Sequence, residues 1–305
     1  MPQVSVIIPT YNRAAYLADA IRSVEAQNYR DIETIVADDG STDNTAEVMA
    51  RFGSRVTYLR LDHHGLPATT RNAGLRASHG EFVAFLDSDD LFLPGKLELQ
   101  LATFDAHPEA ELVYSNGHFF RDIPNEPIGE LLDGLPSPSG NVFAELLCGN
   151  FVFTPTVLVR RTCLDSVGVF DERPDFFAVE DYDLWLRIAA QFPVIYAPGK
   201  VAAVRRHQHN ISRDVVAMNE RVIQVLAKME QLHPNLLREY SDARREAYAR
   251  HHGAIALAQF QQKKWEPAFR HGCRAMAHAL HMSGFGLAAF LAWRRRHRLR
   301  EGTLV

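Results

Sequence analysis

The feature that most constrains this chain is the regular exchange of strand and helix patterns over residues 4–114. Apolar runs typical of buried strands occupy residues 4–9, 32–37, 56–61, 81–86 and 111–114. Helical spacing separates them at residues 14–26, 45–52, 68–78 and 96–104. This alternation predicts an α/β fold with a mostly parallel sheet and right-handed crossovers. The ligand of such a sheet binds beyond the carboxyl ends of its strands, where the polar clusters of this chain also lie.

The pattern changes twice further along the chain. Residues 122–140 are rich in proline and glycine and predict a loop. Four shorter elements follow: a helix at 142–147, a strand at 156–159, a helix at 182–191 and a strand at 194–204. After residue 213 only helices are expected, at 215–231, 236–260 and 265–281, the last two as a helical hairpin. We therefore expect two halves of one α/β domain, 1–115 and 116–213, and a helical extension, 214–305.

Charge follows the same division. The net charge of the whole chain is only −4, but residues 1–215 carry 18 basic and 30 acidic side chains. Residues 216–305 carry 15 basic and 7 acidic side chains. No nucleic-acid-binding motif accompanies this basic segment. Its charge indicates a membrane surface or an acidic partner instead.

Two further features concern the compartment. The three cysteines are too few and too scattered for a disulfide framework or a zinc site, which is typical of a reducing cytosol. The start of the sequence has no basic segment and no cleavage signature, so we expect no secretory signal and a cytoplasmic location.

The last residues allow two interpretations. Residues 282–293 are apolar but too short to span a bilayer, and arginines follow them directly. One interpretation is peripheral contact of residues 282–300 with an anionic membrane, at the inner face of the plasma membrane. The other is a terminal helix docked on the protein with a solvated basic tail.

The second strand ends in the sequence Asp38-Asp39-Gly40-Ser41. Ser41, Thr42 and Asp43 stand directly before a helix, where such residues are ordinarily caps. Capping does not explain two adjacent carboxylates, whose repulsion requires a compensating donor or ligand.

The fourth strand ends in Asp87-Ser88-Asp89-Asp90. Three carboxylates after a buried strand are costly without a cation, and their hard oxygens suit Mg²⁺ or Mn²⁺ bound to a phosphorylated substrate. The alternative is capping of the helix that follows. Because no glycine-rich phosphate loop is present, a diphosphate would be held by metal and side chains such as Arg71.

Two later clusters complete the candidate site. Glu180-Asp181-Tyr182-Asp183 opens a helix, where the helix dipole alone favours acidic residues. A carboxylate such as Asp181 would take a proton from an attacking hydroxyl if it lay near the metal and diphosphate. His207 follows a strand that returns toward the sheet, where a neutral imidazole suits a metal or a phosphate.

Taken together, these segments resemble the family 2 glycosyltransferases, which have the GT-A fold. The matching segments cover about residues 4–212 in the order of the family: VSVIIPTYNR, DDGSTDNT, RNAGLRASHGEFVAFLDSDD, GVFDE, EDYDLWLR and RRHQHNIS. The resemblance implies a GT-A domain with a C-terminal all-helical extension. It also implies an inverting enzyme that moves one sugar from a nucleotide donor, a UDP-sugar in most members, to a glycan or a lipid-linked acceptor of cell-surface synthesis.

The same resemblance implies a role for each matched residue. Those expected at the nucleotide-sugar are Pro9, Thr10, Tyr11, Asp38, Asp39, Arg71, Asp87 and Ser88. Within this set Asp38 would bond the base, and Asp87 would face the ribose. Asp89, with His207, would bind Mn²⁺ or Mg²⁺ at the diphosphate. Asp181 would be the catalytic base.

This sequence departs from the family in two respects, and two other functions are compatible with its motifs. Family members that polymerise and export polysaccharide carry membrane helices and a Q-x-x-R-W motif, and this sequence has neither. A processive synthase is therefore not expected, and the resemblance gives the helical extension no role. The alternatives are an inactive relative that scaffolds a glycan-assembly complex, which the intact motifs disfavour, and a metal-dependent nucleotidyltransferase.

Overall fold

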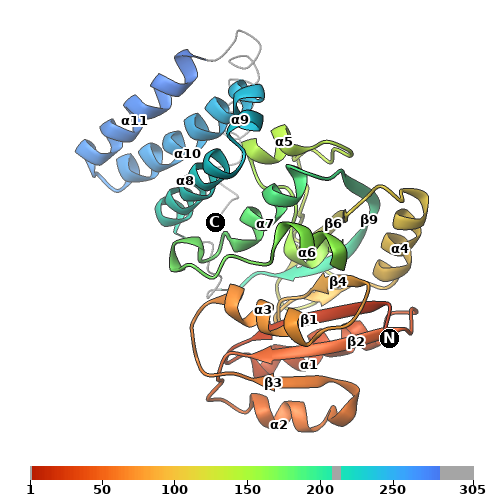
Figure 1. Ribbon diagram of the computed structural model, residues 1–305. Helices are drawn as coiled ribbons and strands as arrows, with labels where there is room; N and C mark the ends of the chain where they lie inside the picture. Colours follow the sequence, from red (N-terminus) through yellow and green to blue (C-terminus); the bar gives the residue numbers. More distant parts are fainter. Residues whose placement is uncertain (1, 208–213, 282–305) are drawn as a thin grey trace. The chain divides into compact units, whose positions relative to one another are not determined.

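The computed structural model describes residues 2–207 and 214–281. Its contacts divide the chain into an α/β unit, Met1–Val142 with Phe151–Gln208, and a helical unit, Phe143–Asn150 with His209–Val305. Figure 1 follows the chain from the red strands of the α/β unit to the blue helices. Strands from both predicted halves, 1–115 and 116–213, form one sheet. The predicted boundaries between the three segments stay predictions.

The α/β unit is built on a mixed sheet. Its strands are β1 (Val4–Thr10), β2 (Ile32–Asp38), β3 (Thr57–Arg60), β4 (Phe82–Phe85), β5 (Leu91–Phe92), β6 (Leu112–Phe120), β7 (Gly129–Glu130), β8 (Val157–Arg160) and β9 (Val194–Arg205). They lie in the order β3-β2-β1-β4-β8-β6-β9-β5, and β7 pairs with β6. The pairs among β1 to β4 are parallel, as is β6 with β9, whereas β5, β7 and β8 pair antiparallel.

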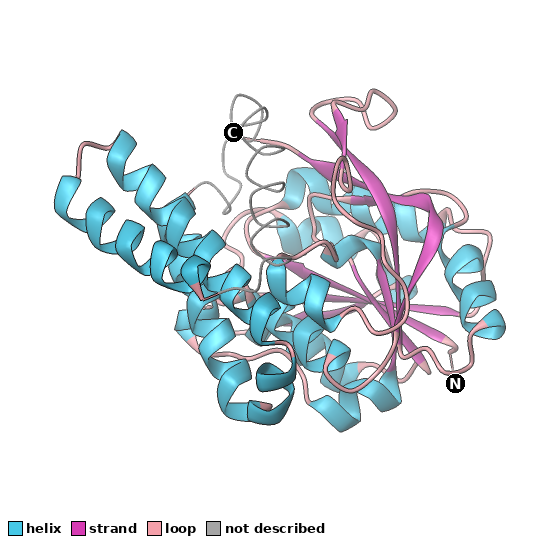
Figure 2. Ribbon diagram, turned by 90° about the horizontal axis from the view of Figure 1, so that it is seen from above, coloured by secondary structure: helices cyan, strands magenta, loops and turns pink. Residues whose placement is uncertain are grey.

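Helices cover both faces of this sheet. The α-helices of the unit are α1 (Ala14–Glu25), α2 (Thr45–Ala50), α3 (Pro67–Ala77), α4 (Lys96–Ala106), α6 (Arg161–Val167) and α7 (Glu180–Ala189). Val6 and Ile8 of β1 belong to the apolar cluster that includes α1, α2 and α4. Ile7 points to the other face, where a Cβ on Gly74 of α3 would lie 2.5 Å from its Cγ2, so only glycine allows this approach. Figure 2 shows the strands between the two sets of helices.

The register of the parallel strands brings their carboxyl ends to one edge of the sheet. Thr10 of β1 pairs with Asp38 of β2, and Asp38 pairs with Arg60 of β3. On the other side of β1, Ile7 pairs with Phe85, the last residue of β4. The segments that follow β1, β2 and β4 therefore meet at this edge.

The predicted α/β class with a helical extension is confirmed, and every helix and strand predicted within residues 4–114 is present. The sequence patterns did not predict three of the strands and α-helices: β5, α6 and β7. The loop predicted at 122–140 is wrong in one detail, since Gly129–Glu130 pairs with β6. Two-residue strands have no periodicity of their own and form where a longer neighbour offers its hydrogen bonds.

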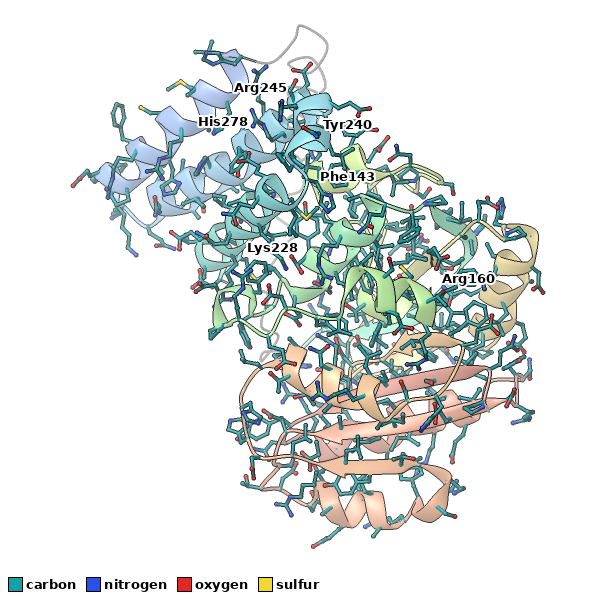
Figure 3. All side chains as sticks on the ribbon, in the orientation of Figure 1. Phe143, Arg160, Lys228, Tyr240, Arg245 and His278 are labelled. Carbon is teal, nitrogen blue, oxygen red and sulfur yellow. The ribbon has the colours of Figure 1, made fainter. Side chains whose placement is uncertain are left out.

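The helical unit packs around α10. Its elements are α5 (Phe143–Cys148), α8 (Val215–Leu232), α9 (Pro234–Glu239), α10 (Ser241–Gln261) and α11 (Trp265–Leu280). Helix α10 contacts α11, as the predicted hairpin required, and it also contacts α8 and α5. The single helix predicted over 236–260 is wrong, because Tyr240 has ψ of 40° and divides it into α9 and α10. The Tyr240 ring lies 5.8 Å from that of Phe143 on α5; both are labelled in Figure 3.

Among the described residues, no helix is both long and apolar enough to cross a bilayer. The membrane contact predicted for residues 282–300 lies outside the described residues.

Candidate functional site

The carboxylate of Asp38 is satisfied by the protein itself. Asp38 is buried at the end of β2, and one oxygen accepts hydrogen bonds from the Ser41 N–H at 2.9 Å and the Ser41 hydroxyl at 2.5 Å. Its other oxygen accepts the Tyr58 hydroxyl of β3 at 2.6 Å. Contact with a base stays a prediction for Asp38. Ser41 is therefore a partner of Asp38, and its predicted role as a helix cap is wrong.

Asp39 is also buried among donors, but these come from the loop after β3. Its two oxygens accept the N–H groups of His64 at 2.9 Å and Gly65 at 2.8 Å. The ring nitrogen Nδ1 of His63 lies 2.8 Å from the same carboxylate. The compensating donors that two adjacent carboxylates require are thus supplied by two separate loops.

The segment after β1 is tied to the segment after β2. Asn12 has a φ of 50°, a left-handed conformation that asparagine tolerates, and its side-chain oxygen accepts the Thr42 N–H at 2.8 Å. Asp43 accepts the N–H of Ala14, the first residue of α1, at 3.1 Å, and that of Thr45, the first of α2, at 3.0 Å. Asp43 therefore accepts the first N–H of both helices, although the cap positions themselves are Arg13 and Asn44.

Pro9, Thr10 and Tyr11 lie at the end of β1 as predicted. The first two are buried, whereas Tyr11 is 40% exposed. Its ring stacks on that of His63, with 4.1 Å between the centroids and 15° between the planes. An exposed aromatic pair at the sheet edge is a flat surface of the kind on which a base stacks.

The Asp87–Asp90 cluster does not cap the next helix. The residue before α4 is Gly95, and the N–H of Leu97 in the first turn is accepted by Gln27 at 3.4 Å, so the capping alternative is wrong. Asp87 accepts the Arg71 guanidinium at 2.7 Å, Ser88 is buried, and Asp90 accepts the N–H of Arg205 at 2.8 Å. Burial, followed by the charges of Asp89 and Asp87, raises the pKa of Asp90 well above its ordinary value.

Asp89 lies directly against His207, at 2.7 Å between Oδ2 and Nε2. The pairing of β5 with β9, Leu91 with Ala203, explains this contact: it aligns the residues after Asp89 with the residues before His207. The Nε of Arg13 lies 3.8 Å from the same carboxylate. The two residues predicted as metal ligands are therefore adjacent, although 118 positions separate them.

Arg71 joins the Asp87 cluster to the Glu180 cluster. The guanidinium, on buried α3, donates to Asp87 at 2.7 Å and to Glu180 at 2.5 Å, and it lies 5.5 Å from the centre of the Phe170 ring. Burial opposes its charge, but the carboxylates of Asp87 and Glu180 outweigh burial and raise the pKa of Arg71. One cation thus holds two carboxylates from α7 and the β4 end together.

Asp181 follows Glu180 in the first turn of α7 and has a different environment. It accepts the Thr154 hydroxyl at 2.8 Å and the N–H of Tyr182 at 2.7 Å. Burial, and then the charge of Glu180, raise the pKa of Asp181 to about 6, against the opposing effects of Thr154 and Arg71. A carboxylate whose pKa is this close to neutral pH suits proton transfer.

The donor set fits a divalent cation held partly by substrate. The Asp89 carboxylate and the His207 imidazole are a pair of ligands that suits Mn²⁺ better than Mg²⁺. Within the described part of the chain no three His, Cys, Asp or Glu side chains form a metal cluster. A cation at Asp89 and His207 would therefore take its other ligands from phosphate oxygens and water, as is usual for ions at phosphate sites.

Several site residues had no prediction. For Glu180 the helix dipole alone was a sufficient explanation of an acidic residue at the helix start. No sequence pattern pointed to Thr154, Tyr58 or His63. Ala178, two residues before Glu180, has a φ of 65°, which costs about 1–2 kcal/mol for a residue other than glycine. Strain of this kind is concentrated at functional sites, but an alanine gives no sign of it in the sequence.

Known proteins resemble this chain at the level of sequence. The family model described as Glycosyl transferase family 2 matches residues 5–154. An uncharacterized glycosyltransferase of Rickettsia conorii is 35% identical over 193 residues, 62% of this chain and 30% of the relative. The Escherichia coli UDP-Glc:alpha-D-GlcNAc-diphosphoundecaprenol beta-1,3-glucosyltransferase WfgD is 32% identical over 61% of this chain and 69% of the relative. This chain spans only 26–30% of the length of three Rickettsia relatives.

Two solved structures share the fold. Staphylococcus aureus TarS in complex with UDP has a TM-score of 0.66 and 20% identity, covering 96% of this chain and 87% of TarS. The mannosyltransferase PcManGT of Pyrobaculum calidifontis, in complex with GDP-Man and Mn²⁺, has a TM-score of 0.63 and 20% identity. Its match covers 99% of this chain and 81% of that protein.

Proposed function

Because this chain belongs to glycosyl transferase family 2, we propose that it moves a single sugar from a UDP-sugar to a glycan or lipid-linked acceptor. The reaction inverts the anomeric carbon, and it serves cell-surface polysaccharide or glycoconjugate synthesis from the cytoplasmic side. Asp181 is the base, and Asp89 with His207 binds the divalent cation.

The Arg71 bridge is the observation that carries this proposal. Its two ion pairs, to Asp87 at 2.7 Å and to Glu180 at 2.5 Å, join the cluster proposed for the donor to the cluster that includes the proposed base. An acceptor hydroxyl beside Asp181 would then be close to the sugar of a donor at Asp87. Proximity of this kind is what a direct displacement requires.

In the proposed reaction the acceptor oxygen bonds to the anomeric carbon while the bond from that carbon to the diphosphate oxygen breaks. Asp181 receives the proton of the attacking hydroxyl, and the nucleoside diphosphate leaves with the bonding electron pair. The raised pKa of Asp181, about 6, suits this step because the carboxylate is charged at neutral pH and still basic enough to accept a proton.

The side chains of Asp89 and His207 would hold Mn²⁺ or Mg²⁺, which when bound neutralises the charge of the departing diphosphate. Arg71 adds a fixed positive charge at the same edge of the sheet. We assign the exposed Tyr11 ring, stacked on His63, to the base of the nucleotide. Asp39 holds the loop of His63 in place for that contact.

The relatives suggest which donor to test first. WfgD and a Campylobacter jejuni relative, 43% identical over 101 residues, are both named as beta-1,3-glucosyltransferases with undecaprenol diphosphate acceptors. The name of WfgD also gives UDP-Glc as its donor, and TarS binds UDP. We therefore propose UDP-glucose as the first candidate donor.

The test is a panel of nucleotide sugars incubated with the purified chain and Mn²⁺. We expect release of UDP from UDP-glucose, and transfer when a lipid-linked N-acetylhexosamine is added. Asp89→Asn and His207→Ala should each raise the Mn²⁺ concentration for half-maximal activity by about tenfold or more, since each removes one of two protein ligands.

Asp19→Asn, a substitution on the exposed side of α1, is the matched control and should leave that concentration unchanged. Release of pyrophosphate in place of UDP would indicate a nucleotidyltransferase. Absence of turnover, together with absence of Mn²⁺-dependent UDP binding by calorimetry, would indicate the inactive scaffold.

A further inference from the structure

The helical unit has an exposed apolar surface that the proposed reaction does not use. It consists of six large side chains of α10 and α11, which we call the apolar face of the hairpin: Leu257, Phe260, Trp265, Phe269, Met276 and Leu280. Phe269 is 73% and Leu280 81% exposed, which is unusual for side chains of this size.

The spacing of these residues explains why they share one side of α11. Trp265, Phe269, Met276 and Leu280 are separated by 4, 7 and 4 positions, which places them along one stripe of a helix. The opposite side of α11 is already used. His278 stacks on Tyr248 of α10 with 5.0 Å between the ring centres, and Figure 3 labels it between the two helices.

The two helices present this face together. Phe260 at the end of α10 meets Trp265 at the start of α11 edge to face, with 5.0 Å between the ring centres. Lys263, in the turn that joins the helices, has a φ of 60°. The turn thus carries two aromatic side chains and two adjacent lysines, Lys263 and Lys264, all exposed.

The charged side chains of this part of the hairpin are mostly basic, and two of them, Lys263 and Lys264, directly precede Trp265. Residues 257–281 include four basic side chains, Lys263, Lys264, Arg270 and Arg274, and one acidic side chain, Glu266. Glu266 lies 4.0 Å from Arg270, so its charge is already paired. An occupant of this surface must therefore offer both an apolar layer and negative charge.

We propose that the apolar face of the hairpin binds the surface of an anionic lipid bilayer. Trp265, Phe260 and Phe269 lie among the headgroups and the first acyl carbons, and Lys263 and Lys264 of the turn contact lipid phosphates. A second copy fits less well, because a twofold contact places the same patch on both sides and sets these cations against one another. This proposal is independent of the proposed reaction, and vesicle binding is measured without any sugar donor.

The experiment is flotation of the full chain with vesicles of phosphatidylcholine alone or mixed with phosphatidylglycerol. We expect binding to the anionic vesicles only, weakened by added salt. The double variant Trp265→Ser/Phe269→Ser should lower the partition coefficient by about tenfold or more, because two large apolar side chains no longer leave water. Ile123→Ser/Leu232→Ser, which changes two exposed apolar residues elsewhere, is the matched control and should bind like the unchanged protein.

Fluorescence gives a second measurement that does not depend on the double variant. The chain has three tryptophans, and Trp185 is buried in the α/β unit. In a Trp293→Phe protein, brominated acyl chains should therefore quench Trp265 on addition of anionic vesicles. Absence of quenching, or equal vesicle binding by the double variant, would overturn the proposal.

Two other results would also overturn it, each in favour of a different occupant. A dimer in sedimentation equilibrium that dissociates in the double variant would indicate a second copy. Protection of Trp265 from a water-soluble quencher before any lipid is added would indicate that residues 282–305 cover the face.

Discussion

Two adjacent carboxylates, Glu180 and Asp181, have different electrostatic environments. Glu180 forms an ion pair with the Arg71 guanidinium at 2.5 Å. Asp181 has only neutral donors within hydrogen-bonding distance and lies beside that charge, so burial and Glu180 raise its pKa to about 6. The buried arginine therefore pairs directly with Glu180, whereas the carboxylate of its neighbour Asp181 has a raised pKa.

Asp181→Asn should abolish most of the activity and also stabilise the fold. The pKa of Asp181 is higher in the folded state than its ordinary value of 3.8, so the folded protein binds this proton more tightly. The cost of burying the charge is therefore greatest above about pH 6 and disappears as pH falls toward pH 4. We expect kcat to fall about 10²–10⁴-fold and the free energy of unfolding at neutral pH to rise by about 1–3 kcal/mol, measured by urea denaturation.

Asp183→Asn is the matched control, two positions along the same helix. Asp183 is buried and accepts the Arg187 Nε at 2.9 Å, so its removal leaves a buried cation without this partner. It should lower stability at neutral pH, the opposite sign. A loss of stability in both variants would contradict the raised pKa of Asp181.

The residues of the site could be predicted from the sequence, but their partners could not. Carboxylates directly after apolar strands predicted Asp38, Asp87 and Asp89, because the end of a strand needs only a local pattern. The ion pair of Arg71 with Glu180 spans 109 positions and depends on how α3 and α7 pack on the sheet. The same limit applies to Asp38, whose partner Tyr58 comes from another strand.

At the scale of elements, the contact of α10 with α11 includes a group of histidines. The Nδ1 atoms of His252 and His271 lie 3.0 Å apart, and His278 stacks on Tyr248. Burial, and then the charge of His271, lower the pKa of His252 to about 4. His251 contacts Asn219 of α8 instead, and burial, followed by Arg250, lowers its pKa to about 3. The packing of the two helices therefore requires neutral imidazoles.

We expect acid to destabilise the helical unit before it affects the sheet. The unfolded chain binds protons at these histidines near pH 6.5, whereas the folded unit does not until about pH 4, so stability falls as pH decreases between the two values. His252→Phe keeps an aromatic ring in place and should reduce this loss by about 1–3 kcal/mol, measured by urea denaturation of the helical far-UV signal. His79→Phe, at an exposed histidine of the α/β unit, should leave the loss unchanged.

Long strands and helices could be predicted from the sequence, whereas very short ones could not. The strands β1, β2 and β4 are mostly apolar and were predicted because a buried strand can be recognised without its partner. β5 has only two residues and exists because β9 pairs with it at Ala203. The break at Tyr240 between α9 and α10 interrupts an otherwise helical pattern, and its ring contacts Phe143, which lies 97 positions earlier in the sequence.

At the scale of the whole molecule, the two parts of the sequence have opposite charge. Residues 1–215 hold 18 basic and 30 acidic side chains, and residues 216–305 hold 15 and 7. All the proposed donor and catalytic residues belong to the α/β unit, and the proposed lipid surface belongs to the helical unit. An anionic membrane attracts the second and repels the first, which favours binding through the helical unit alone.

If the helical unit binds the membrane and the α/β unit binds the donor, the two steps should separate in kinetics. Trp265→Ser/Phe269→Ser should hydrolyse UDP-glucose at the rate of the unchanged protein. With a lipid-linked acceptor in anionic vesicles, its kcat/KM should fall by about tenfold, because less enzyme resides on the surface that carries the acceptor. The loss should shrink when the acceptor is presented in neutral detergent micelles, where phosphate charge no longer concentrates the unchanged enzyme.

Ile123→Ser/Leu232→Ser is again the control. An equal loss of donor hydrolysis in the double variant would show that the hairpin supports the fold of the active site, and the division of roles between the units would be wrong.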